Sequence, residues 1–455
     1  MGLVRGLWDA KLDVQMTEFG RATPSLWQEY EMPANETAAI IGLGYVGLPL
    51  AQAALRARLR VVGFDINEGL ITNLKAGRSP ISDISDDGIQ EMIAAGFEPT
   101  ADASRLAGCS IFVICVPTPL SDEGGPDLTA VISAAASLVP HLKAGDLVIL
   151  ESTTYPGTTE EILGPILARS GLSVPRDVKL AFSPERVDPG NEQYGITNTP
   201  KIVGGVDSGS SQAAESFYGK FCETVVVAKG AREAELAKLL ENTYRHVNIA
   251  LVNELAQLSH ELGVDVWDAI RCAATKPFGF HAFYPGPGVG GHCIPIDPNY
   301  LSHHVRSTLG HSFRFIELAQ DINALMPTYV CRRLQDLLND LGKPVNGSRI
   351  LILWVTYKAN VADSRETPAE PIAVTLRGLG AELSFWDPYV PSWHVEELAV
   401  SRVGNLEAAI DRGDFDVALL LQRHRGLDLD HLQRSGLAVF DTRAVMPVSD
   451  SVVRL

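Results

Sequence analysis

The fold is indicated most clearly by the stretch Ala38-Ala-Ile-Ile-Gly-Leu-Gly-Tyr-Val-Gly-Leu-Pro-Leu50. In this stretch a short apolar run leads directly into a glycine-rich turn, Gly42-Leu43-Gly44-Tyr45-Val46-Gly47. A second apolar run ends in Asp65, 18 residues after Gly47. Glycines at this spacing permit a tight turn and the close approach of a pyrophosphate to the N-terminus of the following helix. A carboxylate at Asp65 would bind both hydroxyls of an adenosine ribose and would repel a 2′-phosphate. The pattern therefore predicts an NAD site rather than an NADP site.

Short apolar runs continue to alternate with segments of helical length, at 110–117, 146–153 and 179–185, and again after Arg349. Uniformly apolar strands that alternate with helices indicate a parallel sheet buried on both faces. Between the two alternating regions, 231–262 has apolar residues at helical spacing and contains no Gly or Pro, which predicts one long helix. The predicted fold is α/β, with two Rossmann-like doubly wound parallel-sheet domains joined by a helical domain that contains this long central helix.

The same patterns predict four segments. An N-terminal extension covers 1–36, an NAD-binding Rossmann domain covers 37–230, a central helical domain with a Gly/Pro-rich loop covers 231–342, and a second Rossmann-like domain covers 343–455.

Composition limits the partners. The chain has 455 residues, 46% of them hydrophobic, and a formal net charge of −17, which argues against a nucleic-acid surface or an anionic membrane as the main partner. We find neither a long uncharged apolar stretch nor a basic N-terminal region followed by an apolar core, so we predict no membrane span or secretion signal and expect a cytoplasmic protein. No CxxC pair occurs, which indicates reduced thiols and predicts no metal site; the six cysteines are at 109, 115, 222, 272, 293 and 331.

Polar residues follow several of the predicted strands. Thr118, Thr153 and Glu185 each come just after an apolar run, and ligands of such sheets lie outside the carboxyl ends of the strands. On the predicted long helix, Lys238 and Asn242 are four residues apart and share one face. From the spacing alone, Lys238 is more simply a solvated helix lysine.

The segment Gly286-Pro-Gly-Val-Gly-Gly-His-Cys-Ile-Pro-Ile-Asp297 is a glycine-dense loop that exposes backbone N–H groups and then presents Cys293 beside His292. This pattern suggests covalent chemistry next to a bound anion, although an isolated cysteine is more often structural. Asp297 adds an acid/base group four residues later.

Several separated motifs now stand in one order: GLGYVGLPL, CVPTP, ESTTYPGTT, SPERVDPGN, ELAKLLENTYRHVNIALVNELA, PGPGVGGHCIPIDP and YKANVADSRETPAEP. In this order they resemble the nucleotide-sugar 6-dehydrogenases of the UDP-glucose/GDP-mannose dehydrogenase family, over about 38–450. SPERVDPGN and the loop before Asp297 look most like the branch that acts on UDP-N-acetylhexosamines, notably UDP-N-acetylglucosamine.

The resemblance implies roles for individual residues. It places the nucleophile on Cys293, with Lys238, Asn242, Asp297, Glu185 and Thr153 as the other catalytic residues. For the NAD site it implies Gly42 to Gly47, Asp65, Pro117, Thr118, Thr153 and Arg365. For the UDP-sugar it implies Glu185, Arg186, Lys238, Asn242, Tyr284, Gly286, Gly288, Gly290, Lys358 and Arg443. It also implies a homodimer built on the long helix.

Oxidation of a primary alcohol to a carboxylate removes four electrons, so two NAD molecules are needed. We expect water held by Thr153 and Asp297 to help remove the hydroxyl proton, while Lys238 and Asn242 stabilise the oxyanion. Cys293 would then form a thiohemiacetal that is oxidised to a thioester, and water activated by Glu185 or Asp297 would hydrolyse it.

One residue departs from the family pattern, since Trp354 stands where the family commonly has glycine. It could alter either packing or the substrate pocket. Alternatives to a UDP-N-acetylglucosamine 6-dehydrogenase are a UDP-N-acetylmannosamine or UDP-glucose 6-dehydrogenase, a single-step NAD-dependent dehydrogenase of a β-hydroxy acid or acyl thioester, and a non-catalytic NAD- or sugar-nucleotide-binding regulator. The single-step enzyme leaves Cys293 and the second α/β domain unexplained.

Overall fold

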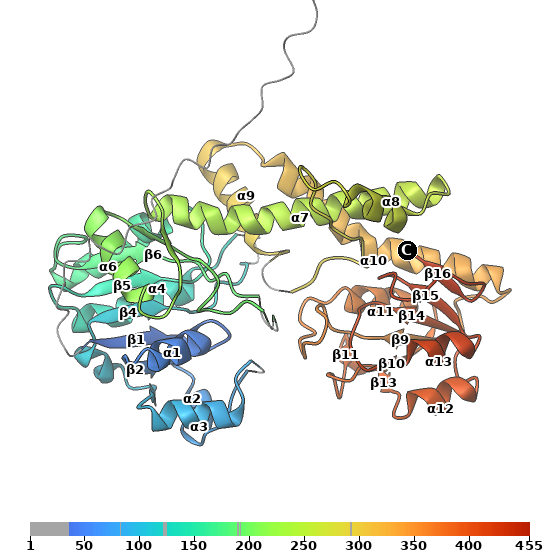
Figure 1. The fold of residues 1–455 in the computed structure, drawn as a ribbon, viewed down its shortest axis with the longest axis horizontal. Helices are drawn as coiled ribbons and strands as arrows, with labels where there is room; N and C mark the ends of the chain where they lie inside the picture. The colour runs from blue at the N-terminus through green and yellow to red at the C-terminus, as the bar shows by residue number, and fades with distance from the viewer. Residues whose placement is uncertain (1–35, 82, 122–124, 189–190, 192, 292–293) are drawn as a thin grey trace, which may run out of the picture. The chain divides into compact units, whose positions relative to one another are not determined.

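A computed structural model describes residues 36–81, 83–121, 125–188, 191, 193–291 and 294–455. The predicted extension lies outside these residues except for Glu36, and so do His292 and Cys293. Figure 1 shows the elements of the described chain coloured from the N-terminus to the C-terminus.

The first sheet forms from the predicted apolar runs and has eight strands in the order β3-β2-β1-β4-β5-β6-β7-β8. They are β1 (Thr37–Ile41), β2 (Arg60–Phe64), β3 (Glu98–Thr100), β4 (Ile111–Ile114), β5 (Leu147–Leu150), β6 (Lys179–Phe182), β7 (Lys201–Gly205) and β8 (Val225–Val227). All neighbouring pairs are parallel except β6 and β7, which are antiparallel, so the expectation of a wholly parallel sheet is wrong at this pair. The reason is the connection: no helix crosses the sheet between β6 and β7 in the described residues, and the chain returns beside β6 in the opposite direction.

Helices cover both faces of this sheet and explain why its strands are apolar throughout. Ile40 of β1 belongs to one buried cluster and its neighbour Ile41 to another, because successive side chains point to opposite faces. The flanking elements are α1 (Gly47–Arg56), α2 (Glu68–Lys75), α3 (Asp86–Ala94), η2 (Ala103–Gly108), α4 (Thr129–Leu138), η3 (Val139–His141), η4 (Thr158–Leu163), α5 (Gly164–Leu167), η5 (Ala168–Ser170) and α6 (Ser208–Tyr218).

The second sheet has six parallel strands in the order β13-β10-β9-β14-β15-β16. Its strands are β9 (Arg349–Leu353), β10 (Glu382–Trp386), β13 (Ser401–Arg402), β14 (Val417–Leu420), β15 (Ala438–Asp441) and β16 (Val452–Arg454). The helices α11 (Ala369–Gly378), α12 (Leu406–Asp411) and α13 (Leu429–Arg434) and the hairpin β11 (His394–Val395) and β12 (Leu398–Ala399) accompany it.

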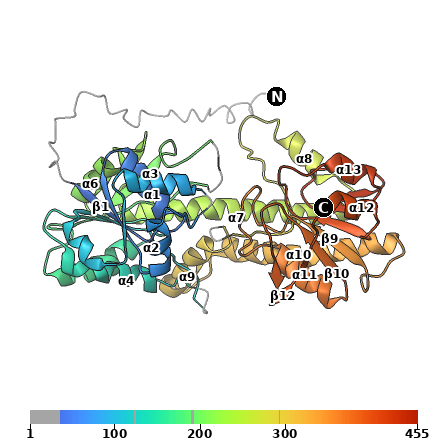
Figure 2. The same ribbon diagram turned by 90° about the horizontal axis from the view of Figure 1, so that it is seen from below.

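Four helices lie between the two sheets in the sequence: α7 (Ala231–Glu261), α8 (Val266–Ala273), α9 (Asp297–Leu309) and α10 (Arg314–Asp340). The long helix predicted over 231–262 is confirmed as α7. Figures 1 and 2 both show α10 running beside α7, and the two pack together. The start of α7 contributes Ala231 and Ala234 to the core of the first sheet, whereas the second half of α10 belongs to the core of the second sheet.

Within the described part of the chain, no helix combines the length and the apolar character needed to cross a bilayer.

The two sheets repeat one hydrogen-bonded turn after their first strands. After β1, Gly42 N–H donates to the carbonyl of Phe64 (2.9 Å) and Leu43 N–H donates to the Asp65 carboxylate (2.9 Å). After β9, Trp354 N–H donates to the carbonyl of Trp386 and Val355 N–H donates to the Asp387 carboxylate, again at 2.9 Å each. The first residue of each turn has a positive φ, +93° at Gly42 and +67° at Trp354.

Trp354 therefore occupies a backbone position that favours glycine, the residue that the family resemblance leads us to expect there. Its side chain is fully buried in a cluster with Leu353, Leu420 and Met446, and its ring lies edge-on to His424 at 5.7 Å between centroids. The indole thus fills the core of the second domain and takes part in packing.

We predict that Trp354→Gly destabilises the protein, although it removes the strain of a positive φ. The strain amounts to about 1–2 kcal/mol, whereas loss of a buried indole costs about 3–5 kcal/mol. Urea unfolding should therefore give a net loss of roughly 1–4 kcal/mol.

Trp354→Ala is the matched control, because it loses the same indole but keeps a Cβ at the positive φ. We expect the order of stability to be wild type, then Gly, then Ala. A glycine variant at least as stable as the wild type would contradict the packing role of Trp354.

Candidate active site

The turn Gly42 to Gly47 is shaped for a bound phosphate group. A Cβ at Gly42 would lie 2.7 Å from the carbonyl oxygen of Cys115, and a Cβ at Gly47 would collide with the carbonyl of Gly42, so the protein itself requires both glycines. At Gly44, by contrast, a Cβ would meet no described atom within 4 Å beyond its chain neighbours. The open space at Gly44 is where a glycine lets a ligand approach the backbone at the N-terminus of α1.

Asp65 follows β2 directly and accepts hydrogen bonds from the N–H groups of Leu43 and Asn67, each at 2.9 Å. A carboxylate has further lone pairs, which can accept ribose hydroxyls. Leu43 is buried and offers only its backbone, whereas Tyr45 is partly exposed, with the Arg365 guanidinium 5.4 Å from its ring centroid. These residues fit NAD, which when bound supplies the hydride acceptor.

The ends of β4 and β5 meet at two threonines, as predicted for ligand-binding strand ends. The Thr118 hydroxyl donates to the carbonyl of Thr153 at 2.9 Å. From α9, the buried Tyr300 hydroxyl donates to the carbonyl of Thr118. Pro117 between them and β4 is exposed.

One face of α7 carries a buried polar stripe. Glu235, Lys238, Asn242, His246 and Asn253 follow at intervals of three, four, four and seven residues, which places them on one side of the helix. All of these residues except the half-buried Lys238 are buried. Buried polar groups need partners, so the stripe draws other segments onto α7.

Lys238 and Asn242 reach two of the predicted carboxylate residues. The Asn242 amide donates to the Asp297 carboxylate at 2.5 Å, and the Lys238 ammonium donates to the backbone carbonyl of Glu185 at 2.6 Å. Burial raises the pKa of Asp297 to about 6, against the lowering effects of the Lys238 charge and the Asn242 amide. Lys238 is therefore half-buried and hydrogen-bonded beside the predicted site residue Glu185 rather than fully solvated, and Asp297 can exchange a proton near neutral pH.

Glu235 holds the loop that follows β5. Its carboxylate accepts hydrogen bonds from Gly157 N–H (2.6 Å), Thr159 N–H (2.9 Å) and the Thr159 hydroxyl (2.7 Å). Burial raises the pKa of Glu235 to about 7, although these donors lower it. The residue fixes the segment after Thr153 against α7.

Asn253 holds the glycine-rich loop. Its carbonyl oxygen accepts the N–H of Gly286 at 3.0 Å, and its amide donates to Asn323 of α10 at 2.9 Å. The amide of Asn323 in turn lies 3.3 Å from the carbonyl oxygen of His246. Burial lowers the pKa of His246 to about 4, so its imidazole is neutral at pH 7.

The predicted substrate residues of the loop and of the second domain approach one another. A Cβ at Gly286 would collide with the half-buried Arg443 guanidinium, and a Cβ at Gly290 would lie 2.5 Å from the carbonyl oxygen of Glu366. Burial lowers the pKa of Arg443 to about 10, against the effect of Asp441, which leaves it charged at neutral pH. Gly288, at φ +140°, adopts a backbone conformation that L side chains rarely reach.

Three predicted cations have acidic partners. Lys358 pairs with Asp188 at 2.6 Å, Arg186 pairs with Glu241 at 2.7 Å, and Arg365 pairs with Asp363 at 2.6 Å. Tyr284 is stacked on Trp267, with ring centroids 6.0 Å apart, and is exposed. The predicted nucleophile Cys293 lies outside the described residues.

Comparison with known proteins accounts for these sites together. The NAD-binding domain of the UDP-glucose/GDP-mannose dehydrogenase family matches 36–222, the central domain matches 232–325, and the UDP-binding domain matches 351–447. The chain belongs to the UDP-glucose/GDP-mannose dehydrogenase family. It is an NAD-dependent oxidoreductase, and its second sheet lies in a UDP-binding domain, which the single-step alternative left unexplained.

Relatives of this dehydrogenase differ in the sugar that their names give. The UDP-N-acetyl-D-mannosamine dehydrogenase of Methanococcus maripaludis is 37% identical over 77% of this chain and 79% of the relative. The UDP-N-acetyl-D-glucosamine 6-dehydrogenase of Salmonella typhi is 34% identical over 92% of this chain and 98% of the relative. Among solved structures, the UDP-D-ManNAc dehydrogenase of Pyrococcus horikoshii is 32% identical with a TM-score of 0.82, covering 92% of this chain and 98% of that one.

Residues that sequence reasoning missed in this dehydrogenase are those bound by distant partners: Glu235, Asn253, Asn323 and Tyr300. The sequence did contain a pattern that indicates Glu235 and Asn253, because they continue the helical spacing of Lys238 and Asn242. Polar residues repeating on one face of a helix with apolar residues elsewhere would have indicated a buried polar stripe.

We predict that Glu235 makes the dehydrogenase less stable as the pH rises. Its folded pKa of about 7 exceeds the ordinary value of 4.5, so its contribution to stability is complete below pH 4.5 and is lost as the pH rises through 7. Relative to Glu235→Gln, the wild type should lose roughly 3 kcal/mol over this range in urea unfolding.

Glu233→Gln, at an exposed position of the same helix, serves as the control and should follow the wild type at every pH. A constant difference between wild type and Glu235→Gln from pH 4.5 to pH 8 would show that Glu235 is not the titrating group.

Proposed function

We propose that this dehydrogenase oxidises the C6 alcohol of a UDP-N-acetylhexosamine, with UDP-N-acetylglucosamine as the first candidate, to the uronic acid. The observation that carries the proposal is the α7 stripe, which brings Lys238 and Asn242 to Asp297 and Glu185. The names of relatives that cover most of this chain support an N-acetylhexosamine substrate. UDP-N-acetylmannosamine and UDP-glucose are the alternatives.

The first oxidation requires a base and a stabilised oxyanion. Asp297, with a pKa of about 6, is largely ionised at pH 7 and yet basic enough to accept a proton through a water held with Thr153. The Lys238 ammonium and the Asn242 amide supply donors to the developing negative charge. The product of this step is the C6 aldehyde.

The second oxidation starts from a covalent adduct. The Cys293 thiolate adds to the aldehyde carbon and gives a thiohemiacetal, whose C6 hydrogen leaves as hydride to give a thioester. Water then forms a bond to the acyl carbon, the water proton passes to Glu185, the C–S bond breaks, and the Cys293 thiolate leaves with the bonding electron pair. The overall reaction therefore yields two NADH for each uronic acid.

We predict that Cys293→Ala abolishes formation of the uronic acid, because no thioester can form. The measurement is NADH release and product mass with UDP-N-acetylglucosamine, UDP-N-acetylmannosamine and UDP-glucose, counted per sugar consumed. Wild type should give two NADH per sugar with its own substrate.

Cys272→Ala removes an exposed thiol of α8 and should keep the wild-type stoichiometry. Full acid formation by Cys293→Ala would overturn the covalent mechanism, and one NADH per product in the wild type would overturn the two-step oxidation.

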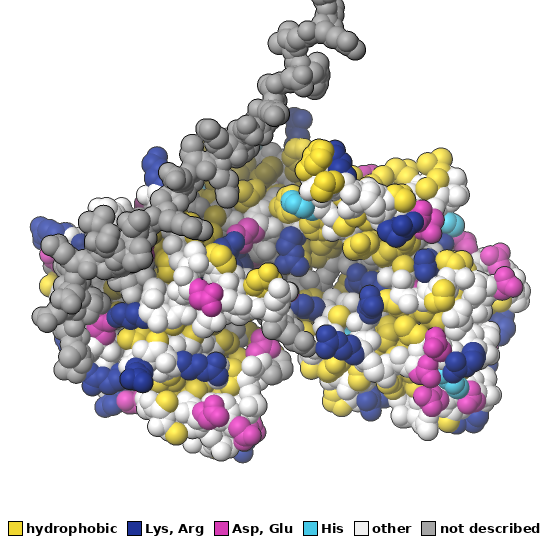
Figure 3. Space-filling model, in the orientation of Figure 1, with side chains coloured by type: hydrophobic (Ala, Val, Ile, Leu, Met, Phe, Trp, Pro, Cys, Tyr) yellow, Lys and Arg dark blue, Asp and Glu magenta, His cyan; other side chains and the backbone are white. Residues whose placement is uncertain are grey.

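We also propose that the enzyme is a homodimer built on α7. Opposite its polar stripe, this helix exposes a continuous row of apolar side chains, with Leu240 63% and Leu262 76% exposed. The row comprises Leu236, Leu240, Tyr244, Leu251, Leu255, Leu258 and Leu262, and Figure 3 shows hydrophobic side chains gathered over α7 and α8. A helix face this apolar is typical of a buried interface, and a two-fold pair of α7 helices would bury it.

We predict that Leu240→Glu combined with Leu251→Glu dissociates the dimer, because two charges would be buried at the contact. Light scattering after size-exclusion chromatography should give the mass of one 49.1 kDa chain. Leu379→Glu, at an exposed position beyond α11, should leave the dimer intact. A wild type that runs as a monomer at micromolar concentration would refute the proposal.

We place the reaction in the cytoplasm. The five described cysteines are free thiols, which is typical of a reducing compartment.

A further inference from the structure

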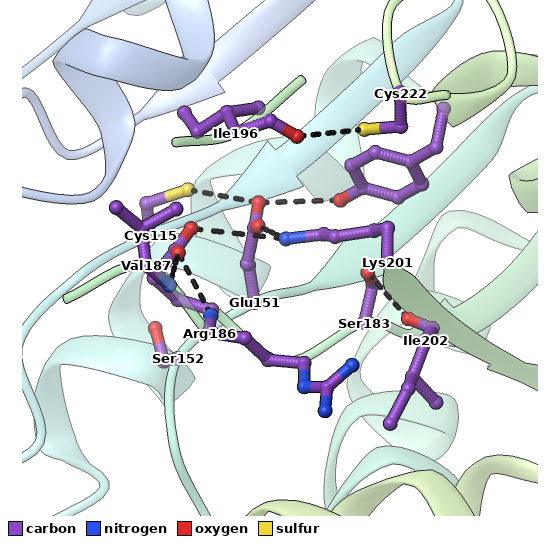
Figure 4. Close-up of polar contacts among 12 residues, drawn as sticks. Cys115, Glu151, Ser152, Ser183, Arg186, Val187, Ile196, Lys201, Ile202 and Cys222 are labelled. Carbon is purple, nitrogen blue, oxygen red and sulfur yellow. Dashed lines mark hydrogen bonds and ion pairs between the residues drawn. The ribbon is translucent and has the colours of Figure 1, made fainter. Parts of the chain in front are cut away.

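A buried ion pair joins the start of β7 to the end of β5 in the first sheet. The Lys201 ammonium at the start of β7 pairs with the Glu151 carboxylate at the end of β5, and both side chains are buried. Glu151 also accepts the Tyr218 hydroxyl at 3.2 Å and faces the Cys115 thiol at 3.7 Å. Figure 4 shows Lys201 and Glu151 pointing toward one another.

The two carboxylate oxygens of Glu185, which lies next to this pair, have different surroundings. Its Oε1 accepts the N–H groups of Arg186 (2.8 Å) and Val187 (2.5 Å), which fixes the carboxylate. Its Oε2 is buried without a hydrogen-bond partner among the described residues, and Lys201 Nζ lies 3.8 Å away. That distance is too long for a hydrogen bond but still within the range of an ion pair.

The surroundings of Glu185 Oε2 are polar. A small cavity with room for about one water molecule is lined by Glu185, Thr199 and Lys201 among others. The Thr199 hydroxyl is also buried without a partner in the described part of the chain.

The charge of Lys201 is maintained by its two acidic neighbours. Burial lowers the pKa of Lys201, but Glu151 and Glu185 outweigh it, and the net shift of the pKa is upward. A buried ion pair contributes little net stability, since desolvation offsets its attraction. The second carboxylate therefore suggests a role for Lys201 beyond holding Glu151.

We propose that Lys201 is a positioning residue that holds the Glu185 carboxylate in the orientation needed for hydrolysis of the thioester. The inference rests on the proposed role of Glu185 as the base of that step. Water attacks the acyl carbon, its proton passes to Glu185, the C–S bond breaks, and the thiolate leaves with the bonding electron pair and is later protonated. The step needs no oxidant or reductant.

The pH dependence of this step depends on the groups that face Glu185. Lys201 faces it from β7 and Glu151 from the end of β5, while Lys238 of α7 binds its backbone carbonyl. Arg186, the next residue, is neutralised by Glu241 of α7. An ammonium favours the ionised carboxylate and a neighbouring carboxylate opposes it, so removal of Lys201 and removal of the Glu151 charge should have opposite effects.

The test follows thioester hydrolysis from pH 5 to pH 9 in single-turnover experiments, with the acyl-enzyme quantified by intact-protein mass spectrometry. In Lys201→Met, hydrolysis should slow at pH 7 and the acid limb of its pH profile should move up by about one to three pH units. In Glu151→Gln, the acid limb should move down. The burst of NADH that precedes hydrolysis should keep its wild-type rate in both.

The double variant Lys201→Met with Glu151→Gln removes both charges of the buried pair together and keeps the test valid if the single lysine variant is unstable. It should also slow hydrolysis relative to Glu151→Gln alone. Lys229→Met, at an exposed lysine, is the matched control and should leave the profile unchanged.

Equal shifts of the same sign in Lys201→Met and Glu151→Gln, or an unmoved acid limb in the lysine variants, would overturn the inference. The variant Glu185→Gln distinguishes failure of the inference about Lys201 from failure of the proposed role of Glu185. If Glu185→Gln hydrolyses the thioester normally, the proposed base is wrong; if it accumulates the acyl-enzyme while the Lys201 variants behave as wild type, only the role of Lys201 fails.

Discussion

The buried polar stripe of α7 is the constraint on which the site depends. This helix of 31 residues is about 46 Å long at 1.5 Å per residue, and it buries polar groups while exposing apolar ones. Each buried group needs a partner, and the partners come from distant segments: the loop after β5, the turn after β6, the first residue of α9, and α10. Satisfying the stripe therefore brings these segments together, and it leaves exposed on the opposite side of α7 the apolar face on which we base the proposed dimer.

The acidic chain binds two diphosphates against its own net charge of −17. Donors close to each binding site have to offset this overall negative charge. We propose that backbone N–H groups at the N-terminus of α1 bind the pyrophosphate of NAD, and that the cations Lys358 and Arg443 of the second domain bind that of the substrate. Lys358 is already paired with Asp188, so a substrate phosphate would replace a carboxylate rather than meet a free charge.

Local patterns allowed much of this to be predicted. The glycine turn and Asp65 follow from spacing, and the structure joins them through the Leu43–Asp65 hydrogen bond. Spacing also predicts that Lys238 and Asn242 share one face of α7, although their role in the site was implied by the family resemblance alone. Contacts set by tertiary geometry could not be predicted, such as the Lys201–Glu151 pair, which joins residues 50 positions apart, and the reversal of β7. The positive φ of Trp354 was not predicted either, because a tryptophan gives no local sign of a left-handed backbone conformation. The domain boundaries and the role of Cys293 stay predictions.

The repeated turn has an evolutionary consequence. The two copies share one hydrogen-bonded frame, but Gly44 leaves the first open, while Trp354 fills the core beside the second. Recognition by main-chain groups tolerates substitution outside the required glycines, because every residue except proline offers the same N–H. Recognition by side chains can change with one codon. Selection can thus retune the sugar nucleotide while the coenzyme stays fixed, and relatives that share a cofactor domain can diverge in the sugar they accept.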